Sequence, residues 1–305
     1  MGKRNILIVT GTGGALGTGH LQRMLALAVH LNATDSFSVK IFLKQNYFPP
    51  DESFKNLLTD IIPENTDLII RDMRDSNMEE ILDLKKIAPV LVIDDSGYGY
   101  SVMDYKVTLL PVPSEVNKPV KPDTSMFLYG YNFTRGIESL AEKIFSERDI
   151  DVAVYAGSNP SQELVAAIKK AIPETANSVL LTRKEPVLLT GNVLFSDTDY
   201  TEILCRTKIM VTHFGLTMFE ANTCGCLIAA LNPSAYHGAL TEIISKEFNI
   251  LYNSEYNFFS PEHLRNVIEK ALKNFTDKKV SVNYIIEEIN KGMNNFTTYV
   301  KNIMR

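Results

Sequence analysis

Two glycine-rich turns, each followed by a helical pattern, carry the residue types best suited to chemistry in this 305-residue chain. The first turn covers residues 10–20 and ends in His20, which follows Gly17 and Gly19. Because imidazole titrates near neutral pH, His20 is a candidate general base. The alternative is a solvated histidine that only completes the turn. The N–H groups at the start of the following helix are suited to an anionic group.

The second turn, at residues 215–217, also leads from an apolar run into a helical pattern. Its backbone N–H groups and the Thr217 hydroxyl are suited to a diphosphate. Glu220 follows three residues later on the same face of the expected helix. The Thr-x-x-Glu spacing is also that of a capping box, which only starts a helix, and the residues alone favour that interpretation.

Three aspartates, Asp72, Asp94 and Asp95, follow apolar runs that we expect to be strands. Doubly wound folds bind their ligands at the carboxyl ends of strands, so these side chains are candidates for contact with the hydroxyl groups of a ligand or for orienting His20. The alternative is that an aspartate at a strand end caps the following turn, and we expect this for at least one of the three.

The elements that must position these residues alternate between strands and helices. In the first half, strands are expected at residues 6–10, 38–43, 67–71, 90–93 and 107–109, with a helix at 78–86. In the second half, strands are expected at 152–155, 179–181, 193–195, 209–211 and 227–231, and helices at 163–171, 201–207, 217–223, 240–248, 261–274 and 284–303. This alternation predicts an α/β protein with two doubly wound, Rossmann-like domains.

The expected domain organisation follows from the restart of this pattern after a proline-rich segment at residues 111–122. We expect an N-terminal domain at 1–132, a C-terminal domain at 133–290, and a terminal helix at 291–305 that packs back on the first domain. Doubly wound domains bind ligands at their strand ends, so the two domains are expected to face a central cleft.

Composition limits the partners of the protein. A net charge of −5 argues against nucleic acid, whose binders concentrate Lys and Arg. We find no signal-peptide pattern and no membrane-spanning apolar stretch, so we expect a cytoplasmic protein. Cys205, Cys224 and Cys226 predict neither a disulfide framework nor a zinc site, and we expect them to pack in a core. No metal, no cofactor and no particular oligomeric state is predicted.

The first glycine turn departs from two common nucleotide-binding patterns. A Walker A loop ends in Gly-Lys-Ser/Thr, whereas this turn ends in Gly19 and His20. The dinucleotide fingerprint needs a glycine where the chain has Leu16, and an acidic residue at the end of the second strand, where the chain has Lys44. We therefore expect neither an ATPase nor a nicotinamide enzyme.

The segment at residues 17–23, Gly-Thr-Gly-His-Leu-Gln-Arg, resembles the G-x-G-H-x-x-R motif of two-domain GT-B nucleotide-sugar enzymes. It is most similar to the PseG/SpsG family, which comprises UDP-2,4-diacetamido-2,4,6-trideoxy-β-L-altropyranose hydrolases and MurG-like relatives. The resemblance continues at residues 67–72, 92–96, 127–131 and 154–160, and its longest match, at 211–228, is similar to the family's Gly-x-Thr-x-x-Glu motif. It implies the GT-B fold.

The resemblance implies a role for each matching residue. His20 would be the catalytic base. Sugar contacts would come from Gly17, Gly19, Arg23, Asp72, Asp94 and His237. Nucleotide contacts would come from Gly157, Ser158, Phe195, His213, Gly215, Leu216, Thr217 and Glu220, with the glutamate binding the ribose hydroxyls of UDP. The resemblance thus favours binding over helix capping at Glu220.

The implied function is a metal-independent nucleotide-sugar hydrolase of polysaccharide biosynthesis, in which His20 activates the water that displaces UDP from a modified deoxy-amino sugar. One alternative is a GT-B glycosyltransferase, in which the same histidine deprotonates an acceptor hydroxyl. Another is a non-catalytic nucleotide-sugar binding protein. Met73, Asn159 and His237 depart from the family pattern, and these departures bear more on the sugar than on the nucleotide.

Overall fold

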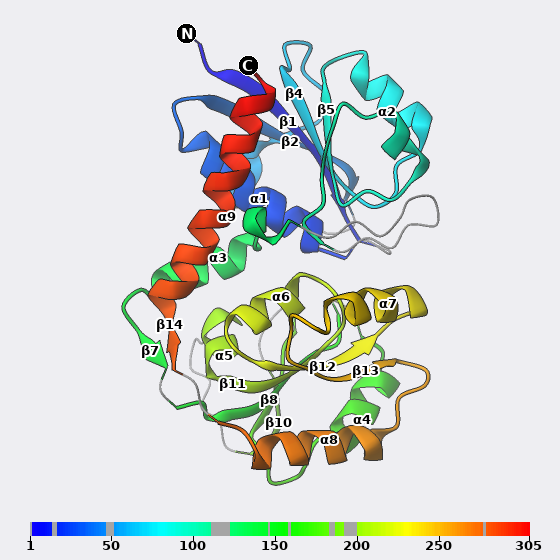
Figure 1. Ribbon diagram of the computed structural model, residues 1–305, viewed down its shortest axis with the longest axis vertical. Helices are drawn as coiled ribbons and strands as arrows, with labels where there is room; N and C mark the ends of the chain where they lie inside the picture. The colour runs from blue at the N-terminus through cyan, green and yellow to red at the C-terminus, as the bar shows by residue number, and fades with distance from the viewer. Residues whose placement is uncertain are drawn as a thin grey trace. The chain divides into compact units, whose positions relative to one another are not determined.

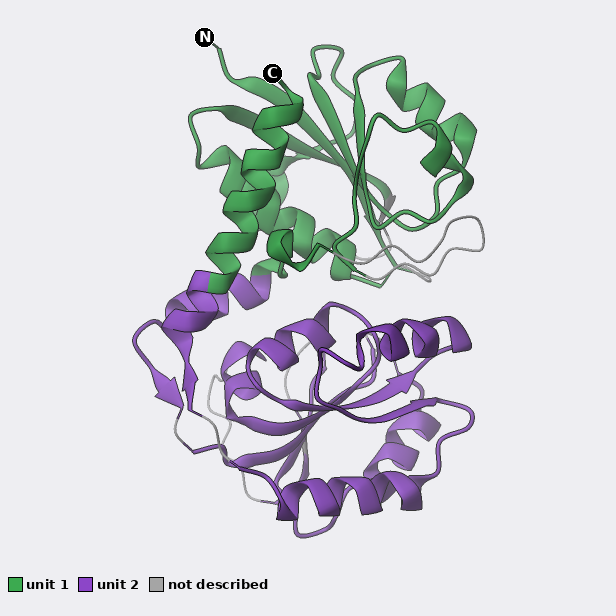
Figure 2. Cartoon of the chain, viewed as in Figure 1, with its two compact units in different colours: residues 1–131, 288–305 green, residues 132–287 purple. Residues whose placement is uncertain are grey.

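The computed structural model describes residues 2–13, 17–46, 52–110, 123–145, 147–157, 160–182, 187–191, 200–276 and 279–305. The chain forms two compact units (Figure 2). Unit 1 is Met1–Tyr131 with Glu288–Arg305, and unit 2 is Asn132–Glu287. Each unit contains its own six-stranded sheet.

The sheet of unit 1 is parallel and doubly wound. Its strands are β1 (Arg4–Thr12), β2 (Phe37–Asn46), β3 (Leu58–Thr59), β4 (Leu68–Asp72), β5 (Val90–Ile93) and β6 (Tyr105–Val107). Their order is β3-β2-β1-β4-β5-β6, and each neighbouring pair is parallel. The strand order reverses between β1 and β4, and this switch point is where such folds bind ligands.

Helices cover both faces of this sheet (Figure 1). They are α1 (Gly19–Asn32) and α2 (Met78–Lys85), accompanied by the short 3₁₀ helices η2 (Glu52–Leu57), η3 (Tyr98–Ser101) and η4 (Thr124–Met126). Leu7 and Val9 of β1 pack in one cluster with Ile81 of α2. The crossover from β1 to β2 through α1 runs along the sheet in the direction opposite to the crossover from β4 to β5 through α2. A right-handed connection therefore places α1 on the other face of the sheet.

Unit 2 repeats this arrangement. Its strands are β8 (Ile150–Tyr155), β9 (Ser178–Leu180), β10 (Val187–Thr190), β11 (Thr207–Thr212), β12 (Leu227–Asn232) and β13 (Ile250–Glu255). Their order is β10-β9-β8-β11-β12-β13, in which only the pairing of β10 with β9 is antiparallel among the pairs described. The switch point of unit 2 therefore lies between β8 and β11.

The helices of unit 2 again form two layers (Figure 1). They are α4 (Gln162–Ala171), α5 (Tyr200–Arg206), α6 (Leu216–Thr223), α7 (Ala235–Ile244) and α8 (Pro261–Lys273). Val152 and Val211 of the sheet pack in one buried cluster with Ile168 of α4 and Leu264 of α8. Figure 1 shows α5, α6 and α7 on the other face.

Two connections link the units along the chain. One is α3 (Tyr131–Ser139), and the other is α9 (Val282–Ile303), which follows the antiparallel pair β7 (Ile144–Phe145) and β14 (Val280–Ser281). In unit 1, Asn295 of α9 donates to the Ser125 carbonyl at 2.8 Å. A Cβ on Gly292 would overlap the Phe127 carbonyl oxygen, so this close approach requires glycine.

The structure corrects two of the expected elements. The strand expected at 107–109 ends at Val107, because the N–H groups of Leu109 and Leu110 bond to Asp94 Oδ1 at 2.6 and 2.8 Å instead of to a strand. The helix expected at 240–248 is α7, which begins five residues earlier, after Ser234. The expected strand at 193–195 and the proline-rich segment at 111–122 lie outside the described residues.

Within the described ranges, none of the helices combines the length and apolar character that a membrane span requires.

Candidate active site

His20 stands at the switch point of unit 1. It is the second residue of α1, which follows the turn after β1, and its side chain is 15% exposed. Its Nδ1 lies 2.8 Å from Oδ1 of Asp72, the last residue of β4. A carboxylate accepts only, so this contact places the imidazole hydrogen on Nδ1 and leaves Nε2 as the basic nitrogen of the neutral ring.

Arg23 joins the two strand-end carboxylates behind His20. Its Nε and Nη2 donate to the two oxygens of Asp72, each at 2.6 Å, and its Nη1 forms an ion pair with Asp94 Oδ2 at 2.7 Å. Arg23 and Asp72 are buried, with exposures of 2% and 0%. Arg23 and Asp72, which the resemblance assigned to the sugar, therefore make these polar contacts within the protein, and Asp72 lies where it can orient His20.

The charges of this cluster keep Asp72 ionised. Burial alone would raise the pKa of Asp72, but Arg23 and His20 beside its carboxylate lower that pKa to about 2. Burial raises the pKa of Asp94, Arg23 opposes this effect, and the charge of Asp72 adds to it. Burial disfavours the charged form of Arg23, yet the two carboxylates raise its pKa above the ordinary value. Asp72 can therefore hold the His20 tautomer at neutral pH.

The neighbouring Asp95 has a structural role. Its carboxylate accepts the N–H groups of Ser76 at 3.1 Å and Gly97 at 2.8 Å, and it forms an ion pair with Arg71 at 2.9 Å. These bonds fix the loops that follow β4 and β5. The expectation that one of the three aspartates caps a turn is confirmed at Asp95.

The turn after β11 forms the centre of the site in unit 2. Gly215 is the N-cap of α6 and has φ of 158°, a conformation that a residue with a Cβ rarely adopts. His213 Nδ1 donates to the Phe214 carbonyl at 2.9 Å, and a Cβ on Gly157 would lie 3.7 Å from His213 Nε2. The turns after β8 and β11 thus meet at the switch point, where the first N–H groups of α6, at Leu216 and Thr217, have no partner within the helix.

Asn232, the last residue of β12, anchors this turn. Its Oδ1 accepts the Phe214 N–H at 2.8 Å, and its Nδ2 donates to Thr241 Oγ1 at 3.2 Å and to Asn253 Oδ1 at 2.9 Å. Asn232 is completely buried. A single amide side chain therefore connects the turn before α6 to α7 and β13.

Glu220 does not form the capping box that its spacing allowed. The N-cap of α6 is Gly215, which makes no side-chain cap bond, so Thr217 lies inside the helix. The Glu220 carboxylate is 3% exposed and accepts the Tyr200 hydroxyl at 2.6 Å through Oε2. The capping-box interpretation is therefore wrong, and a carboxylate stands one helical turn beyond the diphosphate candidates.

The remaining predicted residues lie around these two centres. Gly17 has φ of 65° in the turn after β1, and its carbonyl accepts the Gly13 N–H at 2.8 Å. His237 lies in the first turn of α7, where its Nδ1 is 2.8 Å from Ser234 Oγ and its carbonyl accepts the Thr241 hydroxyl at 3.0 Å. Ser158 and Phe195 lie outside the described residues.

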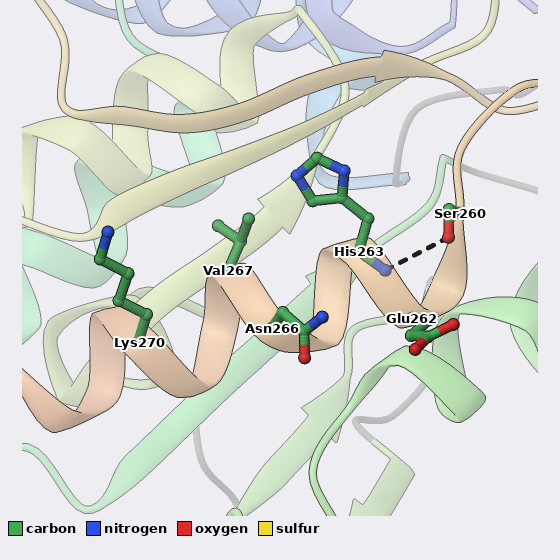
Figure 3. Close-up of a pocket in the computed structure, with 6 residues that line it drawn as sticks. All are labelled: Ser260, Glu262, His263, Asn266, Val267 and Lys270. Atoms are coloured by element: carbon green, nitrogen blue, oxygen red, sulfur yellow. Dashed lines mark hydrogen bonds between the residues drawn. The ribbon is translucent and has the colours of Figure 1, made fainter.

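The cysteines and a surface hollow lie apart from this chemistry. Cys205, Cys224 and Cys226 are buried thiols, and the expectation that they pack in a core is confirmed. A hollow of about 470 Å³ runs along α8 and is lined by Ser260, Glu262, His263, Asn266, Val267 and Lys270 (Figure 3). The dashed bond in Figure 3 joins the His263 N–H to Ser260 Oγ, the N-cap of the helix. This hollow contains none of the predicted site residues.

Two residues that were not predicted from the sequence, Asn232 and Tyr200, also lie in the candidate site of unit 2. Asn232 is a polar residue at the carboxyl end of an apolar strand, and that position was a usable signal. Tyr200 had no comparable signal, because only the packing of α5 beside α6 brings its hydroxyl to Glu220.

Solved structures share this architecture, although no protein-family model and no curated protein sequence matches the chain. A glycotransferase of kitacinnamycin matches with a TM-score of 0.56 and 11% identity over 99% of this chain and 100% of its own. UDP-GlcNAc 2-epimerase from Neisseria meningitidis, bound to UDP-GlcNAc, matches with 0.54 and 10% over 97% and 100%. Spinosyn rhamnosyltransferase SpnG, complexed with thymidine diphosphate, matches with 0.55 and 10% over 97% and 99%.

At these identities the likeness concerns the fold. Together with the two Rossmann-like sheets, it shows that the chain has the GT-B fold. The prediction of two doubly wound α/β domains is confirmed.

Proposed function

We propose that the protein is a GT-B enzyme that breaks the bond between a sugar's anomeric carbon and a nucleoside diphosphate and passes the sugar to a hydroxyl acceptor. One observation carries this proposal: His20 is paired with an ionised Asp72 at the switch point of unit 1. Such a pair is suited to deprotonating a hydroxyl. The fold relatives include a glycotransferase and a rhamnosyltransferase, and these two enzymes support transfer as the main reaction.

Unit 2 supplies the nucleotide half of this proposal. The N–H groups at residues 215–217 point out of the α6 N-terminus, where a diphosphate gains hydrogen bonds and the favourable end of the helix dipole. Charge grows on this diphosphate as the glycosidic bond breaks, and fixed N–H groups stabilise it with little reorganisation. Glu220 would bind ribose hydroxyls, as the resemblance implies, and we assign UDP as the nucleotide.

Unit 1 supplies the base. In the proposed step, Nε2 of His20 takes the proton of the acceptor hydroxyl while the acceptor oxygen forms a bond to the anomeric carbon. The bond to the diphosphate breaks, and UDP leaves with the electron pair. The imidazolium that forms is stabilised by the Asp72 carboxylate at 2.8 Å.

Hydrolysis is the second candidate. It uses the same residues with water in place of the acceptor, and the G-x-G-H-x-x-R resemblance at residues 17–23 favours it. A protein that only binds a nucleotide sugar would keep the turn before α6 without using His20.

The test is release of UDP from a panel of UDP-sugars, measured in EDTA with and without a mixture of hydroxyl acceptors. A transferase releases UDP mainly when the right acceptor is present, whereas a hydrolase releases it in water alone. We expect acceptor-dependent release that survives EDTA, because in this proposal N–H groups face the diphosphate. UDP binding without any release would leave only the binding function.

A further inference from the structure

Tyr200 is the least expected participant in the unit 2 site. It is the first residue of α5, and its hydroxyl donates to Oε2 of Glu220 on α6 at 2.6 Å. The bond is short, as expected for a hydroxyl donor and a charged acceptor. It joins two neighbouring helices at one buried carboxylate.

The Tyr200 hydroxyl belongs to a chain of three side chains. It accepts a hydrogen bond from the Thr217 side chain while it donates to Glu220. Burial and the adjacent Glu220 carboxylate raise the pKa of Tyr200 well above its ordinary value, so the phenol stays protonated and remains a donor. The chain begins in the first turn of α6 and ends at the carboxylate one turn further along.

This chain of three side chains reduces the entropy cost of binding a nucleotide through Glu220. A glutamate side chain that is ordered only on binding loses rotamer entropy at that moment. The bond from Tyr200 orders the carboxylate beforehand, with Oε2 held by the phenol. A carboxylate held in this way can accept a ribose hydroxyl, and an analogue that lacks this hydroxyl loses a hydrogen bond to a charged group.

We propose that Tyr200 is a positioning residue that holds the Glu220 carboxylate for a ribose hydroxyl and thereby makes unit 2 select ribonucleoside diphosphates over 2′-deoxyribonucleoside diphosphates. This inference rests on the proposed function, because it assumes that unit 2 binds the nucleotide. It narrows the substrate class to sugars carried on a ribonucleotide, although a relative of the same fold is complexed with thymidine diphosphate.

The test compares two ligands and two variants by calorimetry. UDP and 2′-deoxy-UDP are titrated into the wild-type protein, into Tyr200→Phe, which keeps the ring and removes the hydroxyl, and into the control Tyr252→Phe. Tyr252 lies on β13 and its ring packs against His263 of α8, away from Glu220. We expect wild type to bind UDP about 10 to 100 times more tightly than 2′-deoxy-UDP, the range for a hydrogen bond to a charged group.

In Tyr200→Phe we expect UDP to lose affinity about tenfold while 2′-deoxy-UDP changes less than about twofold, so that the ratio collapses. Tyr252→Phe should keep the wild-type ratio. A purely structural role for Tyr200 would weaken both ligands equally, and an unchanged ratio in Tyr200→Phe overturns the inference.

Two further outcomes separate the inference from the proposed function. A wild-type protein that binds both ligands equally overturns the selectivity without any variant, so the test does not depend on the folding of Tyr200→Phe. A wild-type protein that binds neither ligand overturns the assignment of UDP to unit 2 itself. Glu220→Gln gives a second check, because it should also collapse the ratio while keeping an oxygen for the Tyr200 hydroxyl.

Discussion

Asp72 is the last residue of β4, and its carboxylate makes two kinds of contact in unit 1. It holds the His20 tautomer, and it pairs with Arg23 through both oxygens. Its main-chain carbonyl also accepts the Thr10 hydroxyl at 2.9 Å. The candidate base and the stability of the unit therefore depend on the same side chain.

Replacing this carboxylate tests the coupling of charge and stability. Asp72→Asn should destabilise the protein at pH 7 by about 3 kcal/mol, because it leaves the buried Arg23 charge poorly paired. The pKa of Asp72 is depressed in the folded state, to about 2, so its contribution is complete above pH ~4 and is lost as the pH falls toward 2.

The stability gap between wild type and Asp72→Asn should therefore narrow by about 2 kcal/mol between pH 5 and pH 2. Urea unfolding of both proteins across this range, followed by circular dichroism, measures the gap. A gap that stays constant with pH would show that Asp72 does not titrate with the depressed pKa.

Many residues of the candidate site could be predicted from the sequence, but not all of them. His20 and Asp72 were recognisable because a glycine turn and a strand end mark positions where ligands bind. Arg23 bonds to Asp72, and Tyr200 bonds to Glu220. Both contacts depend on side-chain packing between separate elements of the chain. No local pattern encodes such contacts.

At the scale of elements, the same solution occurs twice. In each unit, a glycine turn follows one of the two strands that flank the switch point. A polar residue at the end of a neighbouring strand lies beside that turn. In unit 1 this residue is Asp72, and in unit 2 it is Asn232, whose Oδ1 holds the Phe214 N–H. The start of the helix that follows each turn is therefore held by a side chain from a neighbouring strand.

Asn232→Ala tests whether this anchor serves binding. It leaves the Phe214 N–H without its partner, a loss of about 1 to 3 kcal/mol, and frees the turn before α6. We expect UDP affinity to fall at least about tenfold, and calorimetry measures the fall.

Asn32→Ala is the matched control. The Asn32 amide makes the same kind of contact in unit 1, accepting the Val39 N–H at 2.9 Å and donating to the Val39 carbonyl at 3.1 Å. It should lower stability without changing UDP affinity. Equal losses of UDP affinity in both variants would refute a specific role for Asn232.

Element boundaries were predictable where periodicity decided them and not where side chains intervened. The bounds of β5 and the start of α8 agree with the pattern of apolar residues and with the Pro261 start signal. The end of β6 did not follow the pattern, because Asp94 captures the N–H groups of Leu109 and Leu110. The strand β13 was missed because its residues are only half-buried and lack a continuous apolar run.

At the scale of the whole molecule, two units with separate cores share one chain. The sequence showed this organisation because the strand and helix alternation restarts in the second half. It also predicted a terminal helix that packs back on the first domain, but not the close approach of Gly292 to Phe127, because this contact depends on the position of the Phe127 carbonyl.

Separate cores predict separate responses to ligand and mutation. UDP at 100 times its Kd should stabilise unit 2 by about 2.7 kcal/mol and leave unit 1 unaffected. Gly292→Ala should destabilise unit 1 alone, because the added Cβ overlaps the Phe127 carbonyl oxygen. Hydrogen exchange read by mass spectrometry reports on each unit separately, and protection by UDP in β1 and β4 without protection in β11 and α6 would contradict the assignment.

The role of His20 as the base is tested by the turnover of wild type and His20→Ala on the UDP-sugar that wild type uses, with the Kd for UDP measured on the same samples. We expect kcat to fall by about 10² to 10⁴, the contribution of a general base, while the Kd for UDP stays within about threefold. A His20→Ala protein that keeps full kcat would contradict this role.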